Sequence, residues 1–163
     1  MPFATADICD LYGDRAQIVL PVLHPYGGVK RCFGKIRTIR LDEDNRGLVS
    51  MLKNEKGKGG IVVVDAGGDY CAIVGERLMG FAKDNGWAAI VVNGYVRDVV
   101  ETGKIAVGLW ALGTCPMRST KRAPAIRDIP LEFAGVVFRP GEYLYADHDG
   151  MVLIPDNTVN ISD

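Results

Sequence analysis

Residues 61–68, with the sequence IVVVDAGG, decide the fold of this chain, because a short apolar run ends at a polar residue and two glycines. Four β-branched residues in a row are typical of a strand buried on both faces. Asp65 and the glycines after it predict a tight turn. Residues 75–85 then follow a helical pattern, and residues 88–92 predict a second buried strand. The order strand, helix, strand predicts a parallel βαβ unit with a right-handed crossover.

The rest of the chain alternates between short helices and short strands. Helices are expected over residues 5–12 and 45–53, and strands over residues 18–23, 33–41, 135–138, 143–147 and 151–154. The last two strands are expected to form a hairpin across the turn HDG. Residues 107–112 are an apolar run, and residues 115–127 are a basic loop. With no repeat or linker, residues 1–163 are expected to form one α/β domain.

Composition excludes several classes of protein. The formal net charge is −1, which argues against direct binding of nucleic acid, because such proteins usually carry a basic face. The apolar runs are strand-sized, so no membrane span is expected, and the N-terminal segment lacks the pattern of a signal peptide. The cysteines are scattered and form no CxxC pair, which indicates reduced, mostly buried thiols in a cytoplasmic protein.

Two turns are expected to meet at one edge of the sheet. Residues 65–68 follow the first buried strand, and residues 93–98 follow the second. Ligands of open α/β sheets bind beyond the carboxyl ends of the strands. Glu76 opens the intervening helix, so the amides of Arg77 and Leu78 lie in its first turn and are free to bind a carboxylate.

The second turn carries Arg97 and Asp98, followed by Glu101. Asp98 offers oxygen ligands to a hard divalent cation, and Arg97 offers a fork that fits a carboxylate or a carbonyl oxygen. The alternative is an exposed ion pair between neighbours, which contributes little to stability. The local residues by themselves favour that alternative.

A longer pattern favours the site. Glu76 is followed by twenty residues, then Arg97-Asp98, two more residues and Glu101. This spacing resembles the signature of the regulator of ribonuclease activity A family, whose catalytic branch comprises the class II 4-hydroxy-4-methyl-2-oxoglutarate aldolases. The segments ICDLY at residues 8–12, VVDAGG at 63–68 and RPGEYLYAD at 139–147 agree with it, so the resemblance spans nearly the whole chain.

The resemblance implies a compact β/β/α sandwich of the swivelling-domain type that assembles as a trimer, or as a multiple of one. It also implies a magnesium or manganese ion held by Asp98, partly through waters. Arg97 would contact the keto oxygen of a pyruvyl group and stabilise the developing enolate.

The same resemblance assigns roles to the first turn of the predicted helix 75–85. The stretch from Gly75 to Leu78 would hold the substrate carboxylate, through the backbone amides of Arg77 and Leu78. Glu76 would orient a metal-bound water that relays a proton. Relatives often have aspartate where this chain has Glu76. Longer aldolases add an acid from the neighbouring subunit, and no residue of this chain is matched to it.

Two functions of different class follow from the resemblance. The first is a metal-dependent aldolase that also decarboxylates oxaloacetate, with a small 2-oxo acid as substrate. The second is a regulator that binds ribonuclease E and lowers its activity without catalysis of its own. The complete acid/Arg-Asp/acid pattern favours the enzyme, whereas the short chain is similar to the regulators.

Overall fold

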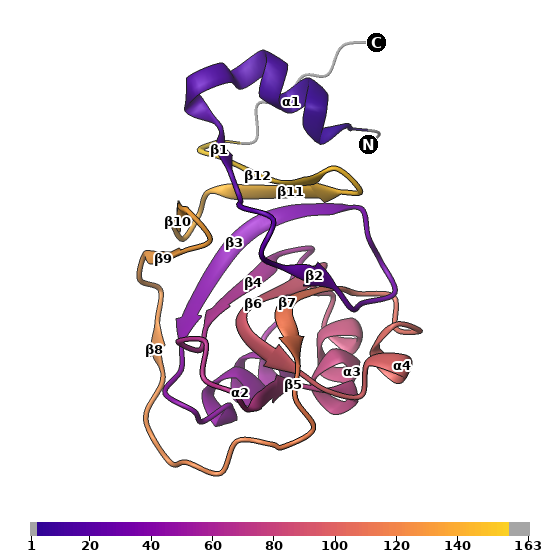
Figure 1. The fold of residues 1–163 in the computed structure, drawn as a ribbon, viewed down its shortest axis with the longest axis vertical. Helices are drawn as coiled ribbons and strands as arrows, with labels where there is room; N and C mark the ends of the chain where they lie inside the picture. Colours follow the sequence, from indigo (N-terminus) through magenta and orange to yellow (C-terminus); the bar gives the residue numbers. More distant parts are fainter. Residues whose placement is uncertain (1–2, 157–163) are drawn as a thin grey trace.

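The computed structural model describes residues 3–156, which form a mixed α/β fold around one curled sheet (Figure 1). The helices are α1 (Thr5–Tyr12), the 3-10 turn η1 (Gly13–Arg15), α2 (Arg46–Asn54), α3 (Glu76–Asp84) and α4 (Val99–Thr102). The strands are β1 (Gln17–Ile18), β2 (His24–Pro25), β3 (Cys32–Arg40), β4 (Ile61–Asp65), β5 (Ala72–Val74), β6 (Ala89–Val96), β7 (Gly108–Thr114), β8 (Ile126–Arg127), β9 (Leu131–Phe133), β10 (Val136–Phe138), β11 (Tyr143–Asp147) and β12 (Gly150–Ile154). The main sheet has the order β1-β12-β11-β3-β4-β6-β7-β2.

The predicted parallel βαβ unit is confirmed. β4 pairs with β6 in parallel, and α3 connects them. Val62 and Val64 of β4 pack into the cluster that contains the inner residues of α2 and α3. Ile61 and Val63, which alternate with them, pack into the cluster on the opposite face. Burial on both faces explains why this strand is an unbroken apolar run.

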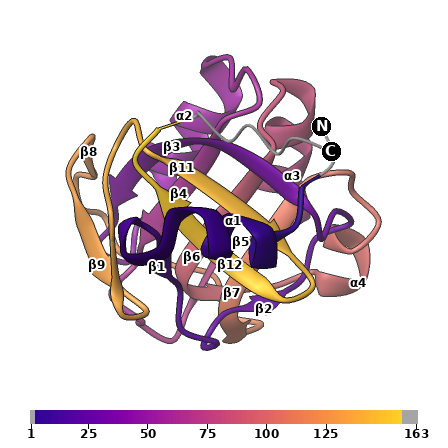
Figure 2. The ribbon, with the colours of Figure 1, turned by 90° about the horizontal axis from the view of Figure 1, so that it is seen from above.

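The N-terminal helix covers the antiparallel end of the sheet. β11 and β12 form the predicted hairpin, and α1 lies across it, far from α2 and α3 (Figures 1 and 2). Asp147 ties the two together, accepting hydrogen bonds from the Thr5 amide at 2.8 Å and the Thr5 hydroxyl at 2.7 Å. Burial raises the pKa of Asp147, but the hydrogen bonds from Thr5 and from the following turn outweigh it, so the pKa is lowered.

β3 joins the two halves of the sheet. Its first residues pair with β11 in antiparallel fashion, and from Ile36 onward it pairs with β4 in parallel. Figure 1 shows β3 as a long curved strand that connects the hairpin to the parallel strands.

The structure corrects several expectations. The predicted strand 18–23 is reduced to β1, because Pro21 has no N–H for a ladder and Leu20 and Val22 are exposed. β6 extends past its predicted end to Val96, because its last residues pair with β5 and β7. β5 and α4 were not predicted and are very short.

The structure also shows how far the apolar run and the cysteines are buried. Residues 107–111 of the apolar run are buried inside this chain and Leu112 is half-buried, with residues 108–112 in β7. The cysteines are free, yet only Cys115 is fully buried, which corrects the expectation of mostly buried thiols. Burial nevertheless raises the pKa of Cys32 to about 12. None of the described helices has the length and apolar character needed to cross a membrane.

Candidate functional site

A cavity of about 390 Å³ opens beside β5, where four segments of the chain meet. The segments are the start of α2, β5 with the first turn of α3, the turn that carries Arg97 and Asp98, and the basic loop 118–122. This volume lies in the range of small-molecule sites, about 300–1,000 Å³. The cavity therefore brings Gly75, Arg77, Leu78, Arg97 and Asp98 together, as the sequence predicted.

The carboxylate of Asp98 lies against the beginning of α3. Its Oδ2 atom accepts a hydrogen bond from the Glu76 amide at 3.0 Å. Asp98 has a φ of 59°, in the left-handed region that aspartate tolerates better than most residues. The Arg97 amide donates to the Val74 carbonyl at 2.9 Å, which fixes the turn against β5.

Gly75 is required by this close approach. A Cβ atom at this position would lie 2.6 Å from Asp98 Oδ2 and 3.4 Å from Arg97 Cγ. Any side chain at residue 75 would therefore push the carboxylate away from the helix N-terminus.

Arg97 and Asp98 do not form an ion pair with each other among the described contacts. The Arg97 side chain is half-buried, and its Nη1 lies 3.4 Å from the Pro116 carbonyl. Asp98 Oδ1 has no hydrogen-bond partner within the part of the chain that is described. The exposed ion pair that was the alternative interpretation is thus not formed.

The two glutamates of the sequence pattern, Glu76 and Glu101, both lie outside the cavity lining. Glu76 contributes its amide to Asp98, but its side chain is exposed and does not line the cavity. Glu101 lies on α4 and pairs with Lys104 at 3.4 Å, also outside the cavity lining. The site is therefore formed around Asp98 and Arg97 and not around the whole pattern.

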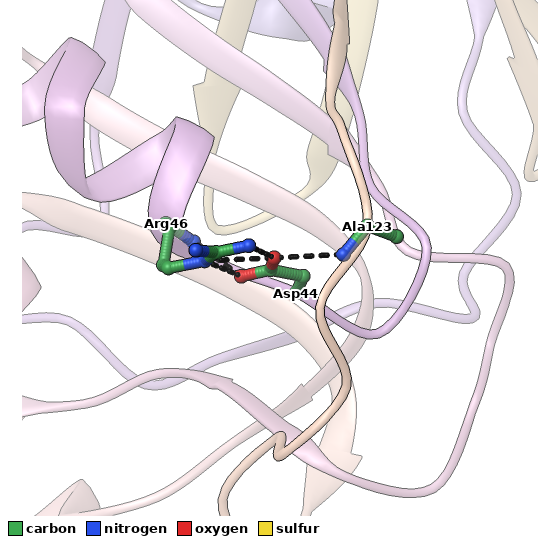
Figure 3. A network of polar contacts seen from close by, with 3 residues as sticks. All are labelled: Asp44, Arg46 and Ala123. Atoms are coloured by element: carbon green, nitrogen blue, oxygen red, sulfur yellow. Dashed lines mark hydrogen bonds and ion pairs between the residues drawn. The ribbon is translucent and has the colours of Figure 1, made fainter.

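A second carboxylate in the lining of the cavity, which is buried, was not predicted. Asp44 is only 4% exposed and binds the Arg46 side chain, with Oδ2 to Nη2 at 2.6 Å and to Nε at 2.9 Å (Figure 3). It also accepts from the Ala123 amide at 2.9 Å. The Arg46 hydrogen bonds hold the pKa of Asp44 well below its usual range, against the opposing effect of burial. Because Ala123 is 79 residues away in sequence, no local pattern indicates this contact.

This contact anchors one end of the basic strap, residues 115–123. The other end is held by hydrogen bonds from the Cys115 amide to the Val96 carbonyl at 3.0 Å and from the Ala72 amide to the Met117 carbonyl at 2.7 Å. The strap thereby carries three cationic residues to the cavity, although it has no regular structure.

The lining of the cavity is strongly cationic. Its ionisable residues are Arg46, Arg77, Arg97, Arg118, Lys121 and Arg122, with Asp44 and Asp98 as the two acids. A concave surface with an excess of one charge attracts ligands of the opposite charge. The cavity is thus suited to a small anion.

The carboxylate of Asp98 suits one kind of metal ion. The described residues contain no group of three or more histidine, cysteine or acidic side chains placed to hold a metal. Magnesium does not need such a group, since it keeps several waters and is often bound by one or two carboxylates plus oxygens of the ligand. Asp98, with one oxygen free, fits that requirement, and nothing in the lining offers sulfur or imidazole.

Known proteins resemble this chain along nearly its whole length. A protein of Laribacter hongkongensis, named "Putative 4-hydroxy-4-methyl-2-oxoglutarate aldolase", is 45% identical over 96% of this chain and 98% of its own. The RNA-processing inhibitor RraA from Thermus thermophilis superposes with a TM-score of 0.93, at 36% identity over 100% of this chain and 99% of that one.

A third protein has the same fold under a different functional description. The structure described as an S-adenosylmethionine: 2-dimethylmenaquinone methyltransferase from Geobacillus kaustophilus HTA426 has a TM-score of 0.92 at 36% identity, over 99% of this chain and 100% of its own. Residues 5–153 match the RraA-like family, described as Aldolase/RraA. The chain is therefore a member of the RraA-like family.

Proposed function

We propose that this protein is a cytoplasmic, divalent-metal-dependent lyase that forms a pyruvate enolate. Its substrates would be 4-hydroxy-4-methyl-2-oxoglutarate, which it cleaves as an aldolase, and oxaloacetate, which it decarboxylates. The observation that carries the proposal is the convergence of Asp98, Arg97 and the first turn of α3 on one cationic cavity. The aldolase name of the Laribacter relative supports it.

Each residue has a task that its position permits. The amides of Arg77 and Leu78, in the first turn of α3, would bind the C1 carboxylate, because helix geometry leaves them without intrahelical acceptors. Arg97 would donate to the C2 keto oxygen, where negative charge develops. Gly75 leaves room for the ligand and the Asp98 carboxylate to approach the helix together.

The bond changes are the same for both substrates. The C3–C4 bond breaks and its electron pair passes to the enolate, while C4 leaves as a ketone or as carbon dioxide. In the aldol cleavage the C4 hydroxyl loses a proton, and in both reactions C3 gains one. Glu76 would exchange these protons through water, since its side chain lies outside the cavity lining. A magnesium or manganese ion held by Asp98 would supply Lewis-acid stabilisation of the enolate charge.

The test follows pyruvate formation from oxaloacetate by the purified protein with magnesium. Activity is expected to disappear after exhaustive chelation and to return with magnesium or manganese. A reaction without protein at the same metal concentration measures the decarboxylation caused by free metal. Arg139→Gln, which removes a charge outside the cavity, is the matched control and should behave as wild type. Full activity without metal would refute the mechanism.

A second candidate function is supported by the likeness to the RNA-processing inhibitor. The protein would then bind ribonuclease E and lower its activity through protein contact, since the net charge of −1 does not favour RNA. Adding wild type and Arg97→Lys to the ribonuclease would separate the two functions. Equal inhibition by both proteins would mean that the ribonuclease contacts a surface of this protein other than the cavity. Tight RNA binding by this chain alone would contradict regulation through protein contact.

The family resemblance also motivates an oligomer. We expect a trimer, or a multiple of three, in sedimentation experiments. A monomer at micromolar concentration would contradict this expectation.

A further inference from the structure

The proposed function accounts for one end of the cavity and leaves the strap unexplained. Asp98, Arg97 and the first turn of α3 would bind a pyruvyl group, which carries a single carboxylate. The strap adds Arg118, Lys121 and Arg122 to the same lining. Such an excess of positive charge exceeds what one carboxylate needs, so a second anionic group of the ligand is the natural counterpart.

Three of the six lining cations are engaged by ion pairs or by an aromatic ring. Arg46 pairs with Asp44 at 2.6 Å, and Lys121 pairs with Asp42 at 2.6 Å. Arg77 lies over the Phe81 ring, at 5.3 Å from its centroid. These side chains are partly occupied by contacts within the protein.

Arg118 and Arg122 differ from these cations. Neither side chain has an ion pair or a hydrogen bond with any residue in the described range 3–156, and both are exposed. A guanidinium is the side chain best suited to bind a carboxylate through two parallel hydrogen bonds. Two such groups in the lining of one cavity are suited to bind a carboxylate.

The strap is positioned for this task. Residue 118 forms a β-bridge with Ala72, three residues before Gly75, so the two ends of the cavity are separated by roughly 10 Å of extended chain. An arginine side chain and a ligand with a five-carbon main chain together span that length. The hydrogen bond from the Ala123 amide to Asp44 fixes the far end of the strap (Figure 3).

We propose that Arg118 and Arg122 bind the distal carboxylate of the substrate, and that they select 2-oxo diacids with a five-carbon main chain over 2-oxo monoacids of the same length. This inference rests on the proposed function, because it takes the pyruvyl end to lie at Asp98 and Arg97. Asp44 is a positioning residue that holds Arg46 and the strap in place.

Two ligands that the enzyme cannot cleave test the inference. 2-Oxoglutarate and 2-oxopentanoate have the same chain length and the same 2-oxo acid end, but only the first has a distal carboxylate. Calorimetry with saturating magnesium gives both dissociation constants for wild type, Arg118→Gln, Arg122→Gln and the control Arg139→Gln. Wild type and the control are expected to bind 2-oxoglutarate at least about tenfold more tightly than 2-oxopentanoate.

Each arginine variant is expected to lose most of that preference and to bind 2-oxopentanoate within about twofold of wild type. The inference would be overturned if wild type bound the two ligands with a ratio of dissociation constants near one. It would also be overturned if the arginine variants kept the full preference. So would an equal loss of affinity for both ligands, which would indicate a general electrostatic effect. If 2-oxopentanoate binds and the preference is absent, only this inference fails. If neither ligand binds, the proposed function fails with it.

Discussion

Asp44 and Asp98 line the same cavity, but their surroundings differ. Asp44 is buried and receives hydrogen bonds from Arg46 and from the Ala123 amide. Asp98 is exposed and receives one hydrogen bond, from the Glu76 amide, on one of its oxygens. A carboxylate whose lone pairs are used within the protein acts as scaffold, whereas one with a free oxygen is available to a cation or a ligand. Residue type alone does not separate these two roles.

The largest effect is expected from Arg97→Lys at the Asp98 end. Lysine keeps the charge but loses the planar fork, so the donor no longer meets the oxygen where charge develops. Oxaloacetate turnover should fall by about a hundredfold, as for the loss of an oxyanion donor, and excess metal should not restore it. Thermal melts should stay close to wild type, because the only described hydrogen bond of the Arg97 side chain is a long one, at 3.4 Å to the Pro116 carbonyl. Wild-type turnover would leave Arg97 without a catalytic role.

Asp98→Asn should have a different signature. A neutral amide is a poorer ligand for a hard cation, so the magnesium concentration that gives half-maximal activity should rise about tenfold. High magnesium should recover part of the rate, which distinguishes this variant from Arg97→Lys. Asp44→Asn is the matched control for metal dependence, because its oxygens are committed to Arg46 and Ala123. If both variants need the same extra metal, the distinction between the two carboxylates is wrong.

Asp44→Asn should instead lower stability. The substitution removes the charge that Arg46 pairs with. Because Arg46 is more than half exposed, hydration of its guanidinium compensates for part of the lost interaction. We expect about 1 kcal/mol less free energy of unfolding, or a melting temperature about 2–4 °C lower for a chain of this size. The strap should also be held less firmly, which would reduce the preference for 2-oxoglutarate. Unchanged stability and unchanged preference would remove Asp44 as a positioning residue.

The sequence predicted the parts of the molecule that depend on local pattern. The buried strand at residues 61–65 and the helix that begins at Glu76 are confirmed, because apolar periodicity acts within a few residues. The expectation that Arg97 and Asp98 lie near the first turn of α3 agrees with the lining of the cavity, whereas residues 65–68, expected at the same edge, are not part of that lining. The contact between Asp44 and Ala123 could not be predicted, since it joins two irregular segments across the fold. Glu76 and Glu101 have the expected spacing, yet neither side chain lines the cavity, because spacing does not fix the direction of a side chain.

The smallest expected effect is a pH dependence that also separates the two carboxylates. The pKa of Asp44 is lowered in the folded protein, chiefly by the hydrogen bonds from Arg46. In the unfolded chain an aspartate has a pKa near 3.9, so above that pH the carboxylate is ionised in both states and its stabilising contribution is fully present. As pH falls through 3.9 toward the folded value, the unfolded chain takes up the proton first, and the contribution is lost.

The melting temperatures of wild type and Asp44→Asn should therefore differ by a constant amount from pH 7 to about 5, and should converge as the pH is lowered from about 5 to about 2. Asp98→Asn serves for comparison, and its melting temperature should stay close to that of wild type throughout, since the side chain is exposed and has one described donor. A difference between wild type and Asp44→Asn that stays constant over this range would mean that its ionised form does not stabilise the fold. The scaffold role of Asp44 would then depend on its shape and not on its charge.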